Sequence, residues 1–454
     1  MDITELGAIS DGKTLCTEII QNAIDDCSIS GGGKVVVPAG KFLTGTLFLR
    51  NNVNLHLKSG AVLLGSTRIE DYLPDVLIKS QDAENISITG FGTIDGQGSS
   101  FWIPADRNKI PYDRAPQWIH KQPRSGNLIR LSGCKNVTIE NVLLTGSESW
   151  TLHLLGCDFV TVTGIKIRNP LHGPNTDGID IQACKNVIIS NCDIYTRDDA
   201  ICLKNRNSKY PDRDCENIII TNCIITTVCN AFKIGTETMG NFRNIIFSNS
   251  IVNAAKPSDE LAKEAATWID TTKQKSGIGP SGGITIATVD GAHIQNININ
   301  NIIMNGVWTP IFIRLANRGV GAQKTFPPVP GTLKDVKISN IIAYGASSAS
   351  SVTAIPGYYV ENVTLENITI KTQGGGDERM AKIELDENIT KYPDPKTWKE
   401  MPVSGFFIRH VKGLRINNLN IIVEENDMRP LLKFDDVIDL HLNNLQTNDA
   451  HFGD

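Results

Sequence analysis

Three aspartates in two short segments have the types and spacing that acid–base chemistry needs. Asp177 lies in GPNTDGIDIQ, and Asp198 and Asp199 lie in RDDAICLK. Two carboxylates that share a water can activate it, while a third carboxyl group can supply a proton. These segments therefore predict a site that combines water activation with proton donation.

The two segments superimpose when one is shifted by 22 residues, which places Ile179 on Ile201. If 22 residues make one turn of a coil, Asp177 lies over Asp199 at one strand spacing, about 4.8 Å. Successive side chains leave a strand in opposite directions, so Asp198 is expected beside this pair.

This register also creates a conflict. Strict alternation gives Asp177 and Asp199 the inward direction of the isoleucines that follow them. We therefore expect the backbone to break at Gly178 and Ala200, so that both carboxylates reach solvent.

The elements that position these residues are predicted by a repeated phrase. From about residue 85 onward, Asn is followed by alternating β-branched and polar residues, as in NVTIEN at 136, NIIITN at 217 and NVTLEN at 362. Many copies are 22 to 31 residues apart, too close for a strand with a crossover helix. Such repeats bury their apolar faces by stacking. The prediction is an all-β fold, a single-stranded right-handed parallel β-helix.

We expect one domain over residues 1–454. Residues 11–26 have helical apolar spacing and are expected to cap the open end of the coil. Two stretches without the repeat, about 255–281 and 372–402, are expected to be excursions from the wall, the first with a helix around PSDELAKEAATWID.

Small and amide side chains recur at fixed positions of the repeat. Cysteines 134, 157, 184 and 215 align just before the strands and are interpreted as buried free thiols rather than disulfides or metal ligands. The asparagines that open the repeats are expected to form a ladder that links neighbouring coils.

The same register predicts outward columns of polar side chains on the face of the aspartates. One column contains Arg130, His153, Asp180, Cys202 and Lys233, and a second contains Gln182, Lys204 and Arg314. Acids beside several cations suit hydrolysis of a glycosidic bond in an acidic polysaccharide. With inversion, acid and base stand about 6.5–9.5 Å apart, which leaves room for water.

Composition excludes other classes of function. The chain has 454 residues, 44 Lys and Arg against 49 Asp and Glu, and no basic block, so no nucleic-acid partner is expected. No apolar run is long enough for a membrane span. The start MDITELGAISDGKT lacks the features of a secretory signal. The expected location is periplasmic or secreted if a signal peptide was removed, and otherwise cytoplasmic.

These motifs resemble those of glycoside hydrolase family 28, the polygalacturonases and rhamnogalacturonan hydrolases with the pectin-lyase-like β-helix fold. The similarity covers nearly the whole chain, with NTDGIDI and DDAICLK as its most specific parts. The resemblance implies that Asp198 is the general acid and that Asp177 and Asp199 activate the water. It also implies that Asn175 orients the site and that Lys204 binds substrate.

Two positions depart from the family pattern. Asn230 stands where polygalacturonases have the histidine of Gly-His-Gly, and Phe312 stands where they have the arginine of Arg-Ile-Lys. Galacturonate recognition at the scissile bond is therefore in question, and a rhamnose-containing pectin or exo action on its oligosaccharides competes with plain polygalacturonan.

Each remaining candidate has a structural alternative. Lys204 and Arg314 either contact substrate or are solvated cations. Lys233 either contacts substrate or pairs with Asp180. His172 either reaches the site, supplying an imidazole, or is hydrogen-bonded locally.

The sequence thus predicts an inverting glycoside hydrolase without metal or cofactor. Its expected partner is acidic plant cell-wall polysaccharide or the derived oligosaccharides. Two rivals stay open: a polysaccharide lyase, which needs a calcium site or a basic residue for proton abstraction, and a non-catalytic glycan-binding β-helix.

Overall fold

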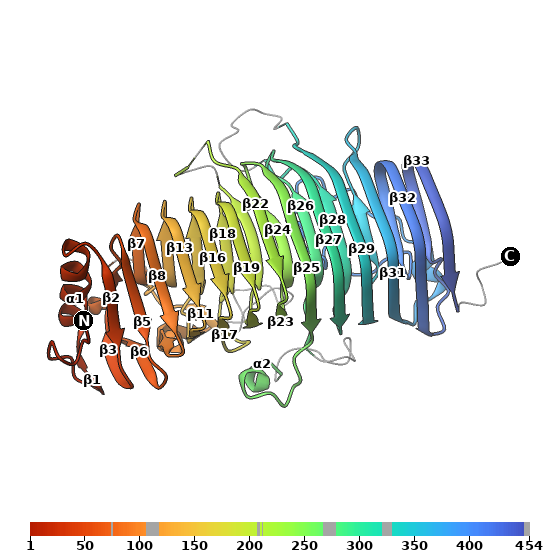
Figure 1. Ribbon diagram of the computed structural model, residues 1–454. Helices are drawn as coiled ribbons and strands as arrows, with labels where there is room; N and C mark the ends of the chain where they lie inside the picture. The colour runs from red at the N-terminus through yellow and green to blue at the C-terminus, as the bar shows by residue number, and fades with distance from the viewer. Residues whose placement is uncertain are drawn as a thin grey trace. The chain divides into compact units, whose positions relative to one another are not determined.

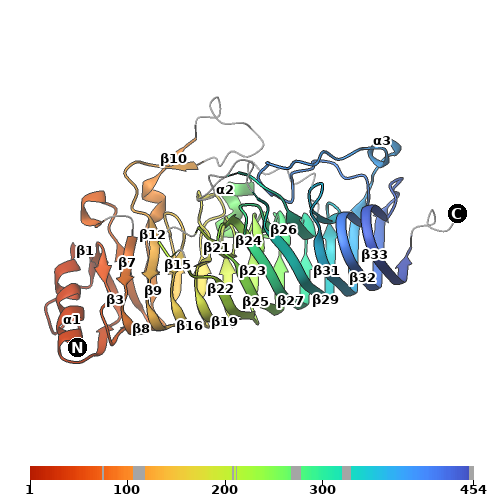
Figure 2. The same ribbon diagram turned by 90° about the horizontal axis from the view of Figure 1, so that it is seen from above.

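The computed structural model describes residues 1–73, 76–105, 118–206, 209–210, 212–266, 278–319 and 329–448 (Figures 1 and 2). These residues form two compact units. Unit 1 comprises Met1–Ala200 with Glu260–Ala265, and unit 2 comprises Ile201–Asp259 with Ala266–Asp454. The single domain over 1–454 stays a prediction.

Unit 1 is built from parallel strands in three stacks, in which each strand pairs with the strand one coil later. The first stack contains β4 (Leu47–Phe48), β7 (Val76–Gln81), β12 (Asn127–Ser132), β15 (Leu152–Leu155) and β18 (Ile179–Gln182). The second contains β2 (Gly33–Val37), β5 (Val53–Leu57), β8 (Glu84–Gly90), β13 (Lys135–Glu140), β16 (Asp158–Thr163) and β19 (Lys185–Ser190). The third contains β1 (Asp11–Leu15), β3 (Gly40–Thr44), β6 (Ala61–Gly65), β9 (Thr93–Asp95), β14 (Leu143–Thr145), β17 (Lys166–Arg168) and β20 (Asp193–Tyr195).

A helix covers the first coil of unit 1, as the sequence predicts, but its bounds differ. Residues 11–15 form strand β1, and α1 runs over Thr17–Ile29 and packs against β2, β4 and β5 (Figure 1). The buried side chains Ile20, Ala23, Ile24 and Cys27 give the helical spacing. The expected helix over 11–26 was wrong in its first turn because Asp11–Leu15 pairs in parallel with β3.

A short hairpin in unit 1 lies outside the repeating coils. It consists of β10 (Trp102–Pro104) and β11 (Trp118–His120), which pair antiparallel with Trp102 opposite His120. In Figure 2, β10 stands away from β9 and β12 on one side of the unit. Two short 3₁₀ turns, η1 (Ile69–Asp71) and η2 (Gly98–Phe101), lie in the preceding loops. The hairpin therefore brings side chains to the wall that no repeat position supplies.

Unit 2 repeats the same parallel arrangement with longer strands. One stack contains β21 (Ile201–Asn205), β24 (Asn230–Thr238), β26 (Gly282–Thr288), β28 (Thr309–Leu315) and β30 (Ser350–Thr353). The other contains β22 (Cys215–Thr221), β23 (Ile224–Thr226), β25 (Phe242–Asn253), β27 (His293–Asn305), β29 (Thr332–Ala346) and β31 (Val360–Gly374). Both stacks continue into β32 (Phe406–Glu425), which pairs with β33 (Leu432–Thr447).

The predicted excursions are partly described. In the first, η3 (Glu260–Ala262) continues into α2 (Lys263–Ala266), and residues 267–277 of the expected helix lie outside the described residues. In the second, β31 extends to Gly374, α3 covers Glu378–Ala381, and the chain reaches β32 without further strands. The second excursion therefore begins slightly later than residue 372.

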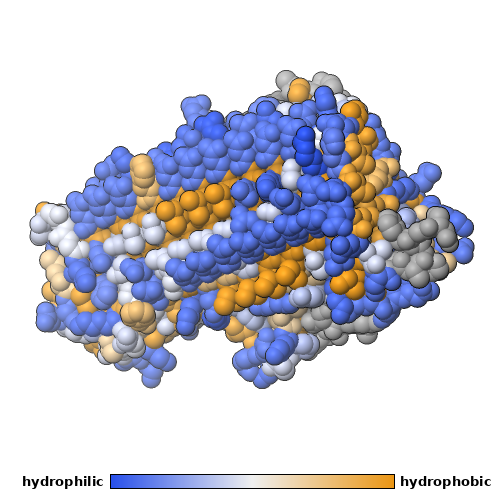
Figure 3. Space-filling model, turned by 45° about the vertical axis from the view of Figure 1, so that its right-hand side comes forward, coloured by the Kyte–Doolittle hydropathy of each residue, from blue (hydrophilic) through white to orange (hydrophobic). Residues whose placement is uncertain are grey.

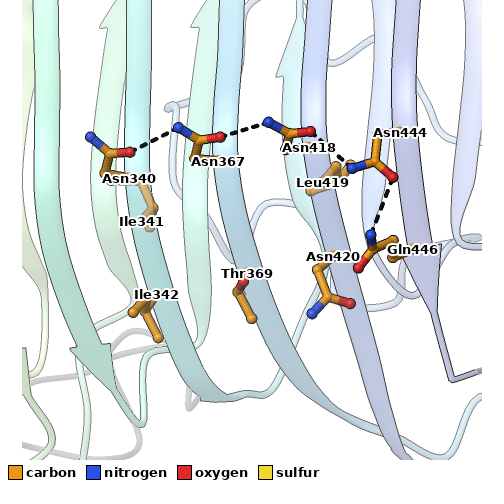
Figure 4. A pocket seen from close by; sticks show the side chains of 10 residues that line it. All are labelled: Asn340, Ile341, Ile342, Asn367, Thr369, Asn418, Leu419, Asn420, Asn444 and Gln446. Atoms are coloured by element: carbon orange, nitrogen blue, oxygen red, sulfur yellow. Dashed lines mark hydrogen bonds between the residues drawn. The ribbon is translucent and has the colours of Figure 1, made fainter.

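The predicted parallel β-helix coils are confirmed by side-chain ladders. In unit 1, Asn136 donates to Asn85 at 3.0 Å. In unit 2, Asn340, Asn367, Asn418 and Asn444 form an unbroken row of amide hydrogen bonds (Figure 4). All of these asparagines have left-handed backbone angles, which Asn tolerates better than most residues.

Cysteines 134, 157, 184 and 215 are buried, as the sequence predicts. All ten are free thiols. Cysteines 134, 157 and 184 follow one another in successive coils of unit 1, where the backbone N–H of Cys157 donates to Cys184 Sγ at 3.3 Å. The hydrogen bond with Cys157 raises the pKa of the Cys134 thiol, and burial raises it further.

One outer face of unit 2 carries exposed apolar side chains in register. Ile224, Ile251, Ile303 and Ile342 lie at paired positions of successive strands, and each is more than a third exposed. Hydrophobic and hydrophilic rows run side by side over the surface in Figure 3. Among the described residues, no helix combines the length and apolarity that crossing a bilayer requires.

Candidate active site

The aspartate motifs of unit 1 are held together by the main chain. The N–H of Gly178 donates to the carbonyl oxygen of Asp199 at 2.9 Å, and the N–H of Ile179 donates to the carbonyl oxygen of Ala200 at 2.9 Å. Two consecutive donors to one neighbouring segment interrupt strand alternation, and β18 begins only at Ile179. The backbone is thus irregular at Gly178, one of the two positions where a break was expected, but the irregularity does not bring Asp177 and Asp199 to solvent.

A side chain at position 178 does not fit. A Cβ there would lie 2.4 Å from the carbonyl oxygen of Ala200 and 3.0 Å from a methyl carbon of Ile194. Glycine is thus required for the close approach of the coils that carry Asp177 and Asp199.

The three aspartates differ in accessibility. Asp177 and Asp199 are each 3% exposed, whereas Asp198 is partly exposed. The prediction that Asp177 and Asp199 both reach solvent was therefore wrong, because neighbouring parts of the fold cover both side chains. The Asp199 N–H donates to Asp198 Oδ1 at 2.9 Å, and a carboxylate oxygen of each lies within 4.8 Å of the other. This separation is shorter than the roughly 6.5–9.5 Å expected between acid and base for inversion. Asp198 is therefore the member most accessible to a large ligand.

The outward column of unit 1 has the predicted register. Arg130 pairs with His153, which pairs with Asp180 on the next coil. His153 Nε2 lies 3.1 Å from Gln182 Oε1, and Trp150 packs edge-on against the His153 ring. Trp150 therefore packs against the wall.

His172 is held by local contacts. Its Nε2 lies 3.4 Å from Glu264 Oε2, and its ring packs against Trp102 and Trp118. Burial lowers the pKa of His172, Glu264 partly offsets this, and Arg197 lowers it further. Burial thus favours the neutral form of this imidazole.

His120 and Glu148, which the sequence did not indicate as site residues, lie beside the aspartate motif. His120 Nδ1 contacts Glu148 Oε1, and His120 Nε2 lies 3.4 Å from Asn175 Oδ1. Asn175 itself is exposed, two residues before Asp177, with a left-handed φ of 48°. No repeat pattern marks His120, because it lies on the β10/β11 hairpin, and Glu148 lies in the polar segment TGSESWT, where an acidic residue gives no special signal.

In unit 2, Lys204 and Asn230 are buried on adjacent strands. Lys204 is 5% exposed. Burial raises the pKa of the Glu237 carboxyl, but Lys204 and Arg206 outweigh burial and leave this pKa below its ordinary value. Asn230 Oδ1 accepts from Thr285 Oγ1 at 2.8 Å. Both side chains thus have partners within the unit.

Lys233 contacts an aromatic side chain of the second excursion. Its Nζ lies 3.4 Å from Tyr392 Oη and 5.6 Å from the ring centre. Arg318 also lies over this ring, at 5.7 Å. Tyr392 is 40% exposed, so part of the ring that Lys233 and Arg318 contact is open to solvent, while Arg318 is also paired with buried Asp290.

Arg314 is buried and hydrogen-bonded within unit 2. It is 3% exposed, its Nη1 donates to Thr353 Oγ1 and Ala354 O at 3.2 and 3.1 Å, and its Nη2 donates to the Glu387 carbonyl. Its guanidinium lies 5.5 Å from the ring centre of Trp398. Burial lowers the pKa of Arg314 to about 10, with Glu387 opposing and Arg409 adding to the shift. The solvated-cation alternative is therefore wrong for Arg314.

The sequence model of Glycosyl hydrolases family 28 matches residues 27–258. A probable polygalacturonase of Vitis vinifera is 27% identical over 402 residues, covering 81% of this chain and 73% of the relative. An exopolygalacturonase of Zea mays is 26% identical over 396 residues, covering 84% of this chain and 85% of the relative.

A solved structure shares the fold. The hyperthermoactive exopolygalacturonase from Thermotoga maritima superimposes with a TM-score of 0.68 at 20% identity, covering 93% of this chain and 91% of that chain. Because the family match spans more than half of its length, the chain belongs to glycosyl hydrolases family 28 and is a glycoside hydrolase.

Proposed function

We propose that this chain hydrolyses glycosidic bonds of pectic polysaccharide or its oligosaccharides, with galacturonate-type linkages as the first substrate class. The printed names of its relatives, polygalacturonase and exopolygalacturonase, support this class. The observation that carries the proposal is the arrangement of the three aspartates. One accessible carboxyl group stands beside two buried carboxyl groups that the main chain holds one coil apart.

In the proposed reaction, Asp198 protonates the leaving glycosidic oxygen as the bond to the anomeric carbon breaks. Asp177 and Asp199 accept a proton from the water that attacks the opposite face of the sugar. Each product carries a new, uncharged hydroxyl group, and the configuration at the anomeric carbon is inverted. Asp198 ends the cycle ionised and the water-activating pair ends it protonated, so one proton exchange with solvent restores the site.

A lysine and an exposed aromatic ring of unit 2 support an acidic sugar as substrate. Lys233 contacts exposed Tyr392, which suits a carboxylate beside a sugar ring, whereas the charge of Arg318 is already paired with Asp290. We propose Lys204, Lys233 and Asn230 as substrate-binding residues. Arg314 is proposed to act indirectly, by holding the excursion that carries Tyr392.

The test is incubation of the purified protein with polygalacturonate, defined oligogalacturonates and rhamnogalacturonan oligosaccharides. Newly formed reducing ends report hydrolysis, and proton NMR of the first product reports its anomeric configuration. We expect cleavage of galacturonate oligomers with inversion. Unsaturated products absorbing in the ultraviolet would indicate a lyase, and binding without cleavage would indicate a glycan-binding protein.

A further inference from the structure

We propose that His120 is a positioning residue that orients the Asn175 side chain toward substrate, and that buried Glu148 fixes His120 for this task. This inference rests on the proposed function, because the oriented amide serves substrate binding beside Asp177. It adds two residues from outside the repeating coils to the site.

Glu148 is a buried carboxylate with a full set of partners. It is 2% exposed, and its Oε2 accepts the Gly126 N–H at 2.9 Å. Its Oε1 contacts His120 Nδ1 and lies 3.4 Å from Arg124 Nε. A buried carboxylate is tolerated only when it is paired and hydrogen-bonded in this way. Its place is therefore fixed, and so is the ring that it contacts.

The contact with Glu148 determines which nitrogen of His120 faces the site. An ionised carboxylate only accepts hydrogen bonds, so Nδ1 carries a proton. The other ring nitrogen, Nε2, lies 3.4 Å from Asn175 Oδ1, which is also an acceptor. Nε2 is thus the ring nitrogen that is directed at Asn175.

The contact with His120 fixes which side of the Asn175 amide faces the substrate. With Oδ1 turned to His120, the two N–H groups of Nδ2 are directed elsewhere. Asn175 is exposed and only two residues before Asp177. These N–H donors fit the oxygens of a sugar hydroxyl or a uronate carboxylate at the site. If His120 were absent, the amide could rotate and present its acceptor instead.

The position of His120 in the fold agrees with this role. Strand β11 pairs only with β10 among the described strands, and it makes no ladder with the coils. The main-chain oxygen of Glu148 accepts from Trp102 Nε1 at 3.0 Å, which ties the hairpin to the same loop. The hairpin thus positions the imidazole of His120 beside the aspartate motif.

The experiment is a double-mutant cycle with His120→Ala, Asn175→Ala and the double variant, assayed on oligogalacturonates. We expect His120→Ala to lower kcat/KM about tenfold, mainly through a higher KM, since it removes about one hydrogen bond that orients Asn175. The same change in the Asn175→Ala background is expected to lower kcat/KM less than about twofold, because the effect passes through Asn175.

His120→Gln provides rescue, because its amide N–H can replace Nε2–H, and most of the lost kcat/KM is expected to return. His441→Ala is the matched control, since His441 is exposed and contacts Asp439 in unit 2. Its kcat/KM is expected to equal that of the wild type. Melting temperatures of all variants separate misfolding from loss of positioning.

The outcomes are distinguishable. If the wild type cleaves the substrate and the effects of the two alanine changes are additive, the role of His120 is overturned but the proposed function stands. Unchanged kinetics of the His120→Ala enzyme would have the same meaning. Failure of the wild type to cleave any pectic substrate overturns the proposed function, and this inference with it.

Discussion

Gly178 donates its backbone N–H to the carbonyl oxygen of Asp199 at 2.9 Å, which joins the turn of one coil to the turn of the next at the acidic motif. The spacing of Asp177 and Asp199 thus depends on main-chain hydrogen bonds rather than on mobile side chains. A substitution that pushes these two turns apart is therefore expected to change the distance between the two carboxyl groups.

Gly178→Ala is expected to disturb this spacing, because the new Cβ would lie 2.4 Å from the Ala200 carbonyl oxygen. We expect kcat to fall by about 100-fold, the effect of roughly 1 Å of misplacement, and the free energy of unfolding to fall by about 1–3 kcal/mol. Gly405→Ala, which meets Leu431 O at 2.7 Å, is the steric control. An equal loss of kcat in both variants would contradict the special role of position 178.

Asp198→Asn tests the proposed general acid. The variant keeps the shape of the side chain but carries no transferable proton, so kcat is expected to fall by about 100-fold or more. Steady-state kinetics on oligogalacturonates check this. Asp193→Asn is the control, because Asp193 pairs with Arg168 elsewhere in unit 1. Wild-type turnover by Asp198→Asn would end the assignment.

Arg314→Met tests whether Arg314 anchors the excursion before β32. It removes the donors to Ala354 and Glu387, so we expect the free energy of unfolding to fall by about 2–3 kcal/mol. Urea denaturation and limited proteolysis near Glu387 measure this. Arg379→Met, which breaks an exposed pair with Glu400, should cost less than about 1 kcal/mol. A higher KM at unchanged stability would instead indicate direct substrate contact.

The amide ladder is expected to contribute measurably to stability. Asn367 donates to Asn340 at 3.0 Å, accepts from Asn418 at 2.8 Å and has a φ of 53°. Asn367→Ala loses the ladder and strains the left-handed backbone, at a cost of about 2–3 kcal/mol. Asn367→Gly relieves the strain and should cost about 1 kcal/mol less. Equal chemical denaturation curves for the two variants would contradict this division.

Asp427 predicts a pH dependence of stability. Burial raises the pKa of Asp427, but hydrogen bonds and charge from Arg429 outweigh burial and leave it below the ordinary value of 3.8. The unfolded chain therefore binds this proton first as the pH falls. The stabilisation is complete above about pH 4 and is lost as the pH falls through the lower, folded-state pKa.

Asp427→Asn is accordingly expected to lower the free energy of unfolding by about 3 kcal/mol at pH 7, because Arg429 stays buried without its carboxylate. The difference from the wild type should shrink at pH 3. Urea denaturation at both pH values measures it, with the exposed Asp439→Asn as control. A constant difference between pH 7 and pH 3 would show that Asp427 does not titrate as described.

Residues that belong to the repeat were predictable. Asn136 and Cys157 occupy ladder and core positions because each coil must satisfy the same backbone and packing conditions as its neighbours. The first turn of the expected capping helix was not predictable, since residues 11–15 gain hydrogen bonds by pairing with β3. Tertiary pairing outweighed local helical spacing there.

The sequence alone determined the coil, the ladders and the 22-residue offset of the aspartates, because these follow from a short period that any copy of the repeat reveals. Only the tertiary structure decided that Asp177 and Asp199 are buried, that the second excursion covers Arg314 and that His120 lies beside Asn175. Those features arise where segments without the repeat pack onto the coils. Contacts between such segments depend on the course of the loops in space, and no periodic pattern in the sequence encodes that course.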